Sequence, residues 1–104
     1  MSSPTSRSLA LLRKEGYRAE VVERWNPHSR TRRDLYGCID ILAIGQGETL
    51  AVQATSGSNA AARVRKLEEA EALTDMREAG WRIEVWAWRK GSNGRWTCRR
   101  VDVS

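Results

Sequence analysis

The stretch that most constrains the fold runs from Asp34 to Asn59 and reads DLYGCIDILAIGQGETLAVQATSGSN. Its apolar residues predict two short strands, 37–44 and 49–55, because each run is short and bounded by turn-forming residues. Gln46-Gly47 lies between the two runs and predicts a tight turn. The stretch is therefore expected to form a β-hairpin at the centre of a sheet.

Three polar side chains interrupt this apolar hairpin: Asp40, Gln53 and Thr55. A buried carboxylate without a partner is costly, so Asp40 requires either a hydrogen-bonding partner or a cation. Gln53 and Thr55 are two residues apart, and side chains at that spacing point to the same face of a strand. The pattern predicts a cation-binding site on one face of the hairpin.

The rest of the chain supplies helices and further strands around the hairpin. Ser3-Pro4 predicts the start of a helix that ends near Gly16, and a second helix is expected over 60–79. Apolar residues in this second segment recur every three positions, so its buried face is broad or the helix bends. Alternating patterns predict strands over 17–25, 81–88 and 95–103. The expected order is αβββαββ, an α/β domain of residues 1–104 with a central mixed β-sheet flanked by helices.

Gly37-x-x-Asp40, followed by an apolar strand, a turn, a second apolar strand and a helix, resembles the core of the PD-(D/E)XK nuclease superfamily. The similarity is to the small Holliday-junction-resolvase-like and phage-type nuclease domains. It implies a restriction-endonuclease-like core, a DNA substrate with branched or structured DNA among the candidates, and Mg²⁺ or Mn²⁺ as cofactor. The chain departs from the motif at Gln53-Ala54-Thr55, where the superfamily has an acid and a lysine.

The resemblance implies a role for each candidate site residue. Asp40 would bind the metal ion with the carbonyl oxygen of Gln53, and Thr55 would position a water molecule. Glu23 would supply an additional acid, or it forms an ion pair with a nearby arginine; both readings stay open. Lys66, on the helix after the hairpin, would replace the missing lysine, although ordinary surface exposure explains it equally well.

The net charge of +5 favours a polyanionic partner, and nucleic acid is the first candidate. Residues 26–33 read as a loop at the rim of the site. Asp34 follows that loop and is expected to pair with a neighbouring arginine, with metal binding as the alternative. The cations expected to contact DNA phosphates are Arg30, Arg32, Arg33, Arg63 and Lys66.

Two functions remain open at this point. The first is a metal-dependent DNA endonuclease, a deoxyribonuclease that works as a homodimer. The second is a catalytically degenerate nucleic-acid-binding module of the same fold, which the Gln-x-Thr replacement favours. No apolar run approaches the ~20 residues of a membrane-spanning helix, so a cytoplasmic protein without membrane contact is expected. The two cysteines lack metal-ligand spacing and are expected to be small buried or half-buried side chains.

Overall fold

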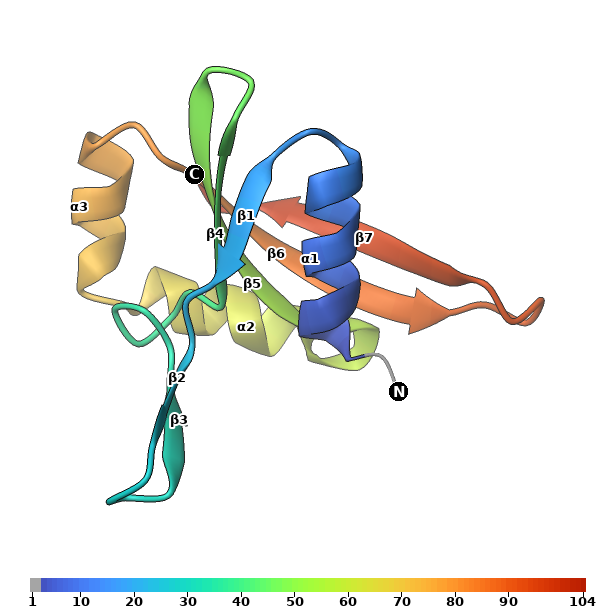
Figure 1. Cartoon of the computed structure of the whole chain (residues 1–104), viewed down its shortest axis with the longest axis horizontal. Coiled ribbons are helices and arrows are strands. Elements are labelled where there is room, and N and C mark those ends of the chain that lie inside the picture. The colour runs from blue at the N-terminus through green and yellow to red at the C-terminus, as the bar shows by residue number, and fades with distance from the viewer. Residues whose placement is uncertain (1–2) are drawn as a thin grey trace.

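A mixed five-stranded sheet forms the centre of the fold, in the order β1-β4-β5-β6-β7 (Figure 1). The computed structural model describes residues 3–104. β5 and β6 are parallel, and the other neighbouring pairs are antiparallel. The strands are β1 (Arg18–Val21), β4 (Ile41–Gly45), β5 (Glu48–Ser56), β6 (Arg82–Lys90) and β7 (Trp96–Asp102). An α/β architecture with a central mixed sheet is therefore confirmed.

The β4–β5 hairpin closes through the two-residue turn that the sequence predicted. Gly45 lies opposite Glu48, and the two residues between them, Gln46 and Gly47, have φ values of 54° and 76°. Two consecutive positive φ values match the right-handed twist of the flanking strands. The turn fixes the register of the hairpin, and β5 becomes the central strand of the sheet.

Helices cover both faces of the sheet (Figure 1). α1 (Pro4–Lys14) starts at the predicted cap Ser3 and packs through Leu12 on one face. α2 (Ala60–Glu68) and α3 (Ala72–Glu78) cover the other face, and a 3₁₀ turn, η1 (Gly57–Asn59), precedes α2. Among the described residues, no helix is long and apolar enough to cross a membrane.

The helix predicted over 60–79 is broken between α2 and α3. A spacing of three residues falls short of the 3.6-residue turn, so a straight helix would rotate its apolar side chains away from the sheet. The break keeps Leu67, Leu73 and Met76 buried in one core cluster. The predicted bend thus takes the form of two short helices.

The strand predicted over 17–25 is also divided. β1 ends at Val21, and the chain then leaves the sheet as β2 (Arg24–Asn26), which pairs with β3 (Thr31–Arg33). Asn26 Oδ1 accepts hydrogen bonds from the backbone N–H groups of His28 and Ser29 and so forms the turn. The loop predicted over 26–33 is therefore confirmed only for the turn at 27–30, because position 26 and positions 31–33 belong to the strands of a projecting β2–β3 hairpin (Figure 1).

The strand predicted from Gly37 starts only at Ile41. Tyr36 and Gly37 have φ values of 55° and 75°, in the left-handed region that interrupts a strand. The resulting turn buries Cys38 and Ile39 in the core. Asp40 follows directly and occupies the position just before β4.

The tryptophans of the last two strands do not lie opposite one another. Trp86 lies opposite Arg100, whose guanidinium is 4.2 Å from the Trp86 ring centroid. Trp96 lies opposite Lys90. The register of β6 and β7 therefore places cations, rather than aromatic rings, against the indoles.

Candidate metal centre

Asp40 lies at the point where three strands of the main sheet meet. Its carbonyl oxygen accepts from the N–H of Val22 at 2.8 Å, and its own N–H donates to Val52 at 3.0 Å. Its carboxylate Oδ2 accepts from the N–H of Ala54 at 2.9 Å and from Gln53 Nε2 at 3.0 Å. Asp40 is 5% exposed, and these bonds hold its side chain on the face that α2 and α3 cover.

Gln53 faces Asp40 from β5 and is 2% exposed. Its amide nitrogen donates to Asp40, whereas its carbonyl Oε1 is buried and has no hydrogen-bond partner among the described residues. A buried carbonyl oxygen without a donor costs about 1–3 kcal/mol. The side chain therefore offers a neutral oxygen that the protein itself leaves unsatisfied, next to a carboxylate.

Asp40 belongs to an acidic cluster that Glu23 and Asp34 complete. One carboxylate oxygen from each of the three residues lies within 4.8 Å of the others. Glu23 precedes β2 and Asp34 follows β3, so the pairing of Arg24 with Arg33 brings the two acids together at the base of the β2–β3 hairpin. The base of the β2–β3 hairpin thus places the carboxylates of Glu23 and Asp34 next to that of Asp40.

Two cations lie against this acidic cluster. Lys66 Nζ of α2 is 3.3 Å from an Asp34 carboxylate oxygen, and Arg32 Nη1 is 3.0 Å from a Glu23 oxygen. The side chains of Asp34 and Glu23 are only 16% and 15% exposed, so both ion pairs are partly shielded from water. Two cations against three carboxylates leave the cluster with a formal charge of −1 when all three acids are ionised.

Burial and the neighbouring acids raise the pKa of Asp40 to about 7. Desolvation is the main cause, and the charges of Asp34 and Glu23 act in the same direction. The hydrogen bond from the Ala54 N–H acts in the opposite direction but is outweighed. In the absence of a cation, Asp40 therefore holds a proton at a pH where a solvated aspartate is ionised.

The structure brings most of the predicted site residues together. Asp40, Gln53, Glu23 and Lys66 all reach the cluster, and Thr55 is buried on the same face of β5 as Gln53. Glu23 forms the predicted ion pair with an arginine, Arg32, and it is also a member of the acidic cluster.

The expected partner of Asp34 was wrong. Asp34 pairs with Lys66 of α2 rather than with Arg32 or Arg33, because it lies at the base of the β2–β3 hairpin and faces α2. A sequence signal for its position existed. Glu23 and Asp34 flank the segment symmetrically about its Asn-Pro turn, and reading that segment as a hairpin places the two acids opposite each other.

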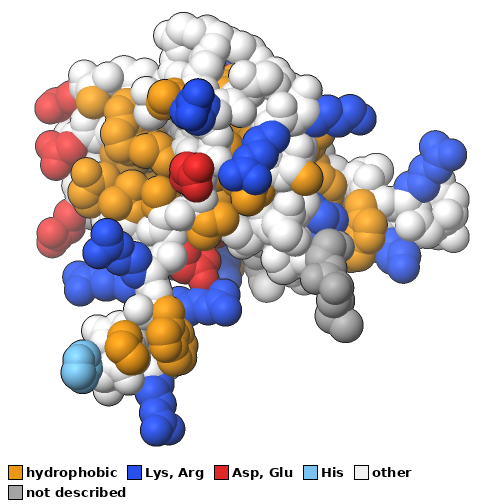
Figure 2. Space-filling model, viewed as in Figure 1, with side chains coloured by type: hydrophobic (Ala, Val, Ile, Leu, Met, Phe, Trp, Pro, Cys, Tyr) orange, Lys and Arg blue, Asp and Glu red, His pale blue; other side chains and the backbone are white. Residues whose placement is uncertain are grey.

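The predicted DNA-contacting cations divide into two groups. Arg30 lies at the distal turn of the β2–β3 hairpin, while Arg32 and Arg33 lie nearer its base. Arg63 is one helical turn from Lys66 and on the same side of α2. Figure 2 shows basic side chains along the projecting hairpin and around its junction with the body. Arg24 and Arg33 lie directly opposite each other, an unfavourable pairing that a polyanion would relieve.

The oxygen atoms of this centre fit a hard divalent cation. Carboxylates and a neutral carbonyl oxygen are the ligands that Mg²⁺ prefers, and three carboxylates lie close enough to share one ion. The unsatisfied Gln53 Oε1 is an independent indication, since a cation would give it a partner. Ala54 directs its N–H to Asp40, and its carbonyl points to the same side of the strand.

Comparison of the chain with protein-family models, with curated proteins and with solved structures found no match.

Proposed function

We propose that this protein is a Mg²⁺-dependent DNA endonuclease with a PD-(D/E)XK-like core. The observation that carries the proposal is the convergence of three carboxylates, the unsatisfied Gln53 oxygen and Lys66 on one face of the sheet. The basic β2–β3 hairpin rises from the same place, so a bound phosphodiester would reach the acidic centre. DNA as the substrate, rather than RNA, follows from the sequence resemblance.

Asp40, Glu23, Asp34 and Gln53 would hold the ion. When bound, Mg²⁺ supplies a Lewis acid that offsets phosphate charge and lowers the pKa of water. Lys66 places a positive charge 3.3 Å from Asp34, where it can stabilise negative charge that develops on the phosphate. The Thr55 hydroxyl lacks that charge but can orient a water molecule by hydrogen bonding.

Arg32 has a positioning role in this scheme. Its guanidinium holds Glu23 at 3.0 Å, while its side chain is 74% exposed and therefore accessible to a phosphate. Arg33 precedes Asp34 in the chain and Arg63 is one helical turn from Lys66, so both add positive charge near the centre. We extend the proposal to a homodimer, because a domain of 104 residues covers few base pairs; sedimentation with and without DNA tests this part.

A second function is favoured by two hydrogen bonds to Asp40. Gln53 Nε2 and the Ala54 N–H both donate to Asp40 Oδ2, so this carboxyl group has two hydrogen-bond partners without a metal ion. That arrangement suits a nucleic-acid-binding module that retains the fold and lacks the chemistry. The two functions differ in whether Mg²⁺ binds and whether DNA is cut.

The deciding experiment is a cleavage assay on linear, nicked, flapped and four-way-junction DNA with Mg²⁺, Mn²⁺ or EDTA. The nuclease predicts metal-dependent cleavage that Asp40→Asn abolishes. The matched control is Asp75→Asn, which removes an exposed carboxylate of α3 outside the acidic cluster and should cleave at the wild-type rate. Binding to DNA without cleavage under every metal condition would support the module instead.

A further inference from the structure

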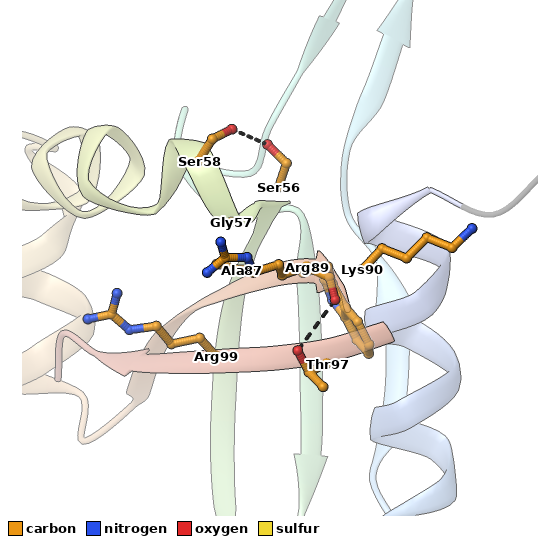
Figure 3. A pocket seen from close by; sticks show the side chains of 9 residues that line it. Ser56, Gly57, Ser58, Ala87, Arg89, Lys90, Thr97 and Arg99 are labelled. Carbon is orange, nitrogen blue, oxygen red and sulfur yellow. Dashed lines mark hydrogen bonds between the residues drawn. The ribbon is translucent and has the colours of Figure 1, made fainter. Parts of the chain in front are cut away.

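A second polar site lies at the far end of α2 from Lys66, where β5 ends. A pocket of about 550 Å³ opens there between η1 and the β6–β7 hairpin (Figure 3). One wall carries the hydroxyls of Ser56 and Ser58, and the opposite wall carries Arg89 and Arg99. Ala87 lies between Arg99 of β7 and Thr55 of β5, and its small side chain leaves the pocket open.

The two arginines converge because of the strand register. Arg89 lies opposite Thr97 and Arg99 lies opposite Ala87, so the two arginines are diagonal neighbours on one face of the β6–β7 pair. Diagonal neighbours are about 7–8 Å apart, a separation that lets two side chains hold one small anion between them. Figure 3 shows the side chains of Arg89 and Arg99 extending toward the same side of the hairpin.

The pocket holds positive charge without a compensating acid. Its described lining includes Arg89, Lys90 and Arg99 and no carboxylate, and the ion pairs of residues 3–104 involve none of these three cations. Lys90 lies 5.9 Å from the Trp96 ring and extends away from the other two in Figure 3. Two arginines and two hydroxyls facing each other are donors suited to the oxygens of a phosphate group.

The pocket shares a sheet face with the candidate metal centre. Thr55, Ala87 and Arg99 form one row across β5, β6 and β7, and Gln53 lies two residues before Thr55 on the same face. Two interstrand spacings and an offset of two residues along the strand place the Cα atom of Arg99 roughly 12 Å from the Cα atom of Gln53. Phosphates of one DNA strand advance 3.4 Å per nucleotide along the helix axis and also wind around it, so this separation spans at most about three or four nucleotides.

We propose that the pocket between η1 and the β6–β7 hairpin is a phosphate-binding site, with Arg89 and Arg99 as its cationic ligands. We assign its occupant as a backbone phosphate of the nucleic acid a few nucleotides from the metal centre. The phosphate chemistry stands on the pocket alone, whereas the assignment to nucleic acid rests on the proposed function.

The test has two arms, and it uses Arg89→Gln, Arg99→Gln and the control Arg95→Gln. Arg95 is an exposed arginine of the same hairpin that does not line the pocket. In the first arm, inorganic phosphate is titrated while amide NMR shifts of Ser56, Gly57 and Ser58 are followed. Each pocket variant is expected to weaken phosphate binding about tenfold, and the control is expected to leave it unchanged.

The second arm measures DNA binding against salt concentration in EDTA, which prevents metal-dependent cleavage. Each pocket variant should reduce the slope of log K against log salt by about 1, and Arg95→Gln should not. If the pocket variants weaken phosphate binding but leave the salt slope of DNA binding unchanged, the nucleic-acid assignment is overturned. That result would indicate a small phosphorylated ligand. Unchanged phosphate binding in both pocket variants would overturn the site itself.

Asp40→Asn separates this proposal from the nuclease proposal. The variant alters the metal centre and leaves every residue of the pocket in place, so phosphate binding should match that of the wild type. Absence of cleavage with arginine-dependent phosphate binding would refute only the nuclease. Asp40-dependent cleavage with phosphate binding that ignores Arg89 and Arg99 would refute only the pocket.

Discussion

Asp40→Asn is expected to stabilise the metal-free protein at pH 8 and to leave its stability nearly unchanged at pH 4. In the folded protein the pKa of Asp40 is raised to about 7, mainly by burial, whereas an aspartate in an unfolded chain titrates near 3.9. A carboxyl whose folded pKa is raised favours folding only while it is protonated. Its contribution is complete below about pH 4 and is lost as the pH rises to about 7.

The size of the effect follows from the difference of roughly three units between the pKa of Asp40 in the folded protein and its pKa in the unfolded chain. At 1.4 kcal/mol per unit, ionised Asp40 lowers the free energy of unfolding by up to about 4 kcal/mol above pH 7. The amide oxygen of the asparagine can accept the bonds that Gln53 and Ala54 donate to Asp40 Oδ2, and its N–H₂ group can donate to the neighbouring carboxylates. The variant therefore keeps the hydrogen bonds and removes the buried charge.

The assay is urea unfolding of both proteins in EDTA between pH 4 and pH 8, followed by the fluorescence of the buried Trp86 and the other indoles. The difference in unfolding free energy should grow with pH in favour of the variant. Saturating Mg²⁺ should then stabilise the wild type alone, by about 2.7 kcal/mol at a hundredfold excess over Kd. A difference that is the same at pH 4 and pH 8 would refute the reasoning, as would a less stable variant at pH 8.

Three further predictions concern other residues. Gln53→Glu replaces the N–H donor 3.0 Å from Asp40 with a carboxylate. Urea unfolding in EDTA at pH 8 should therefore show a free energy of unfolding lower by about 1–3 kcal/mol. Calorimetry should show tighter Mg²⁺ binding than in the wild type. Lys66→Ala should slow cleavage at least tenfold in a single-turnover assay while changing stability by less than about 1 kcal/mol, because the Lys66 side chain is 40% exposed; equal rates would exclude Lys66 from the site. Gly37→Ala should cost about 1–2 kcal/mol because Gly37 has φ 75°, whereas the control Gly57→Ala should melt like the wild type because a Cβ there meets its nearest atom at 3.5 Å.

The sequence by itself determined the elements whose signals are local. The Gln46-Gly47 turn, the Ser3 helix cap and the strand β6 depend on neighbouring residues, and each forms as expected. The same locality identified Asp40 and Gln53, since a carboxylate and an amide within apolar strands are unusual wherever the strands pack. The three-residue apolar spacing likewise predicted either a broad buried face or a bend in the second helical segment, and the structure has the break between α2 and α3.

Tertiary structure decided which polar groups meet. Asp34 and Lys66 are 32 residues apart and form an ion pair because the base of the projecting β2–β3 hairpin lies next to α2. Arg89 and Arg99 converge because the register of β6 and β7 places them diagonally on one face. The raised pKa of Asp40 depends on burial and on acids delivered by another part of the chain. These properties depend on distances across the fold, which residue types and local spacing do not specify.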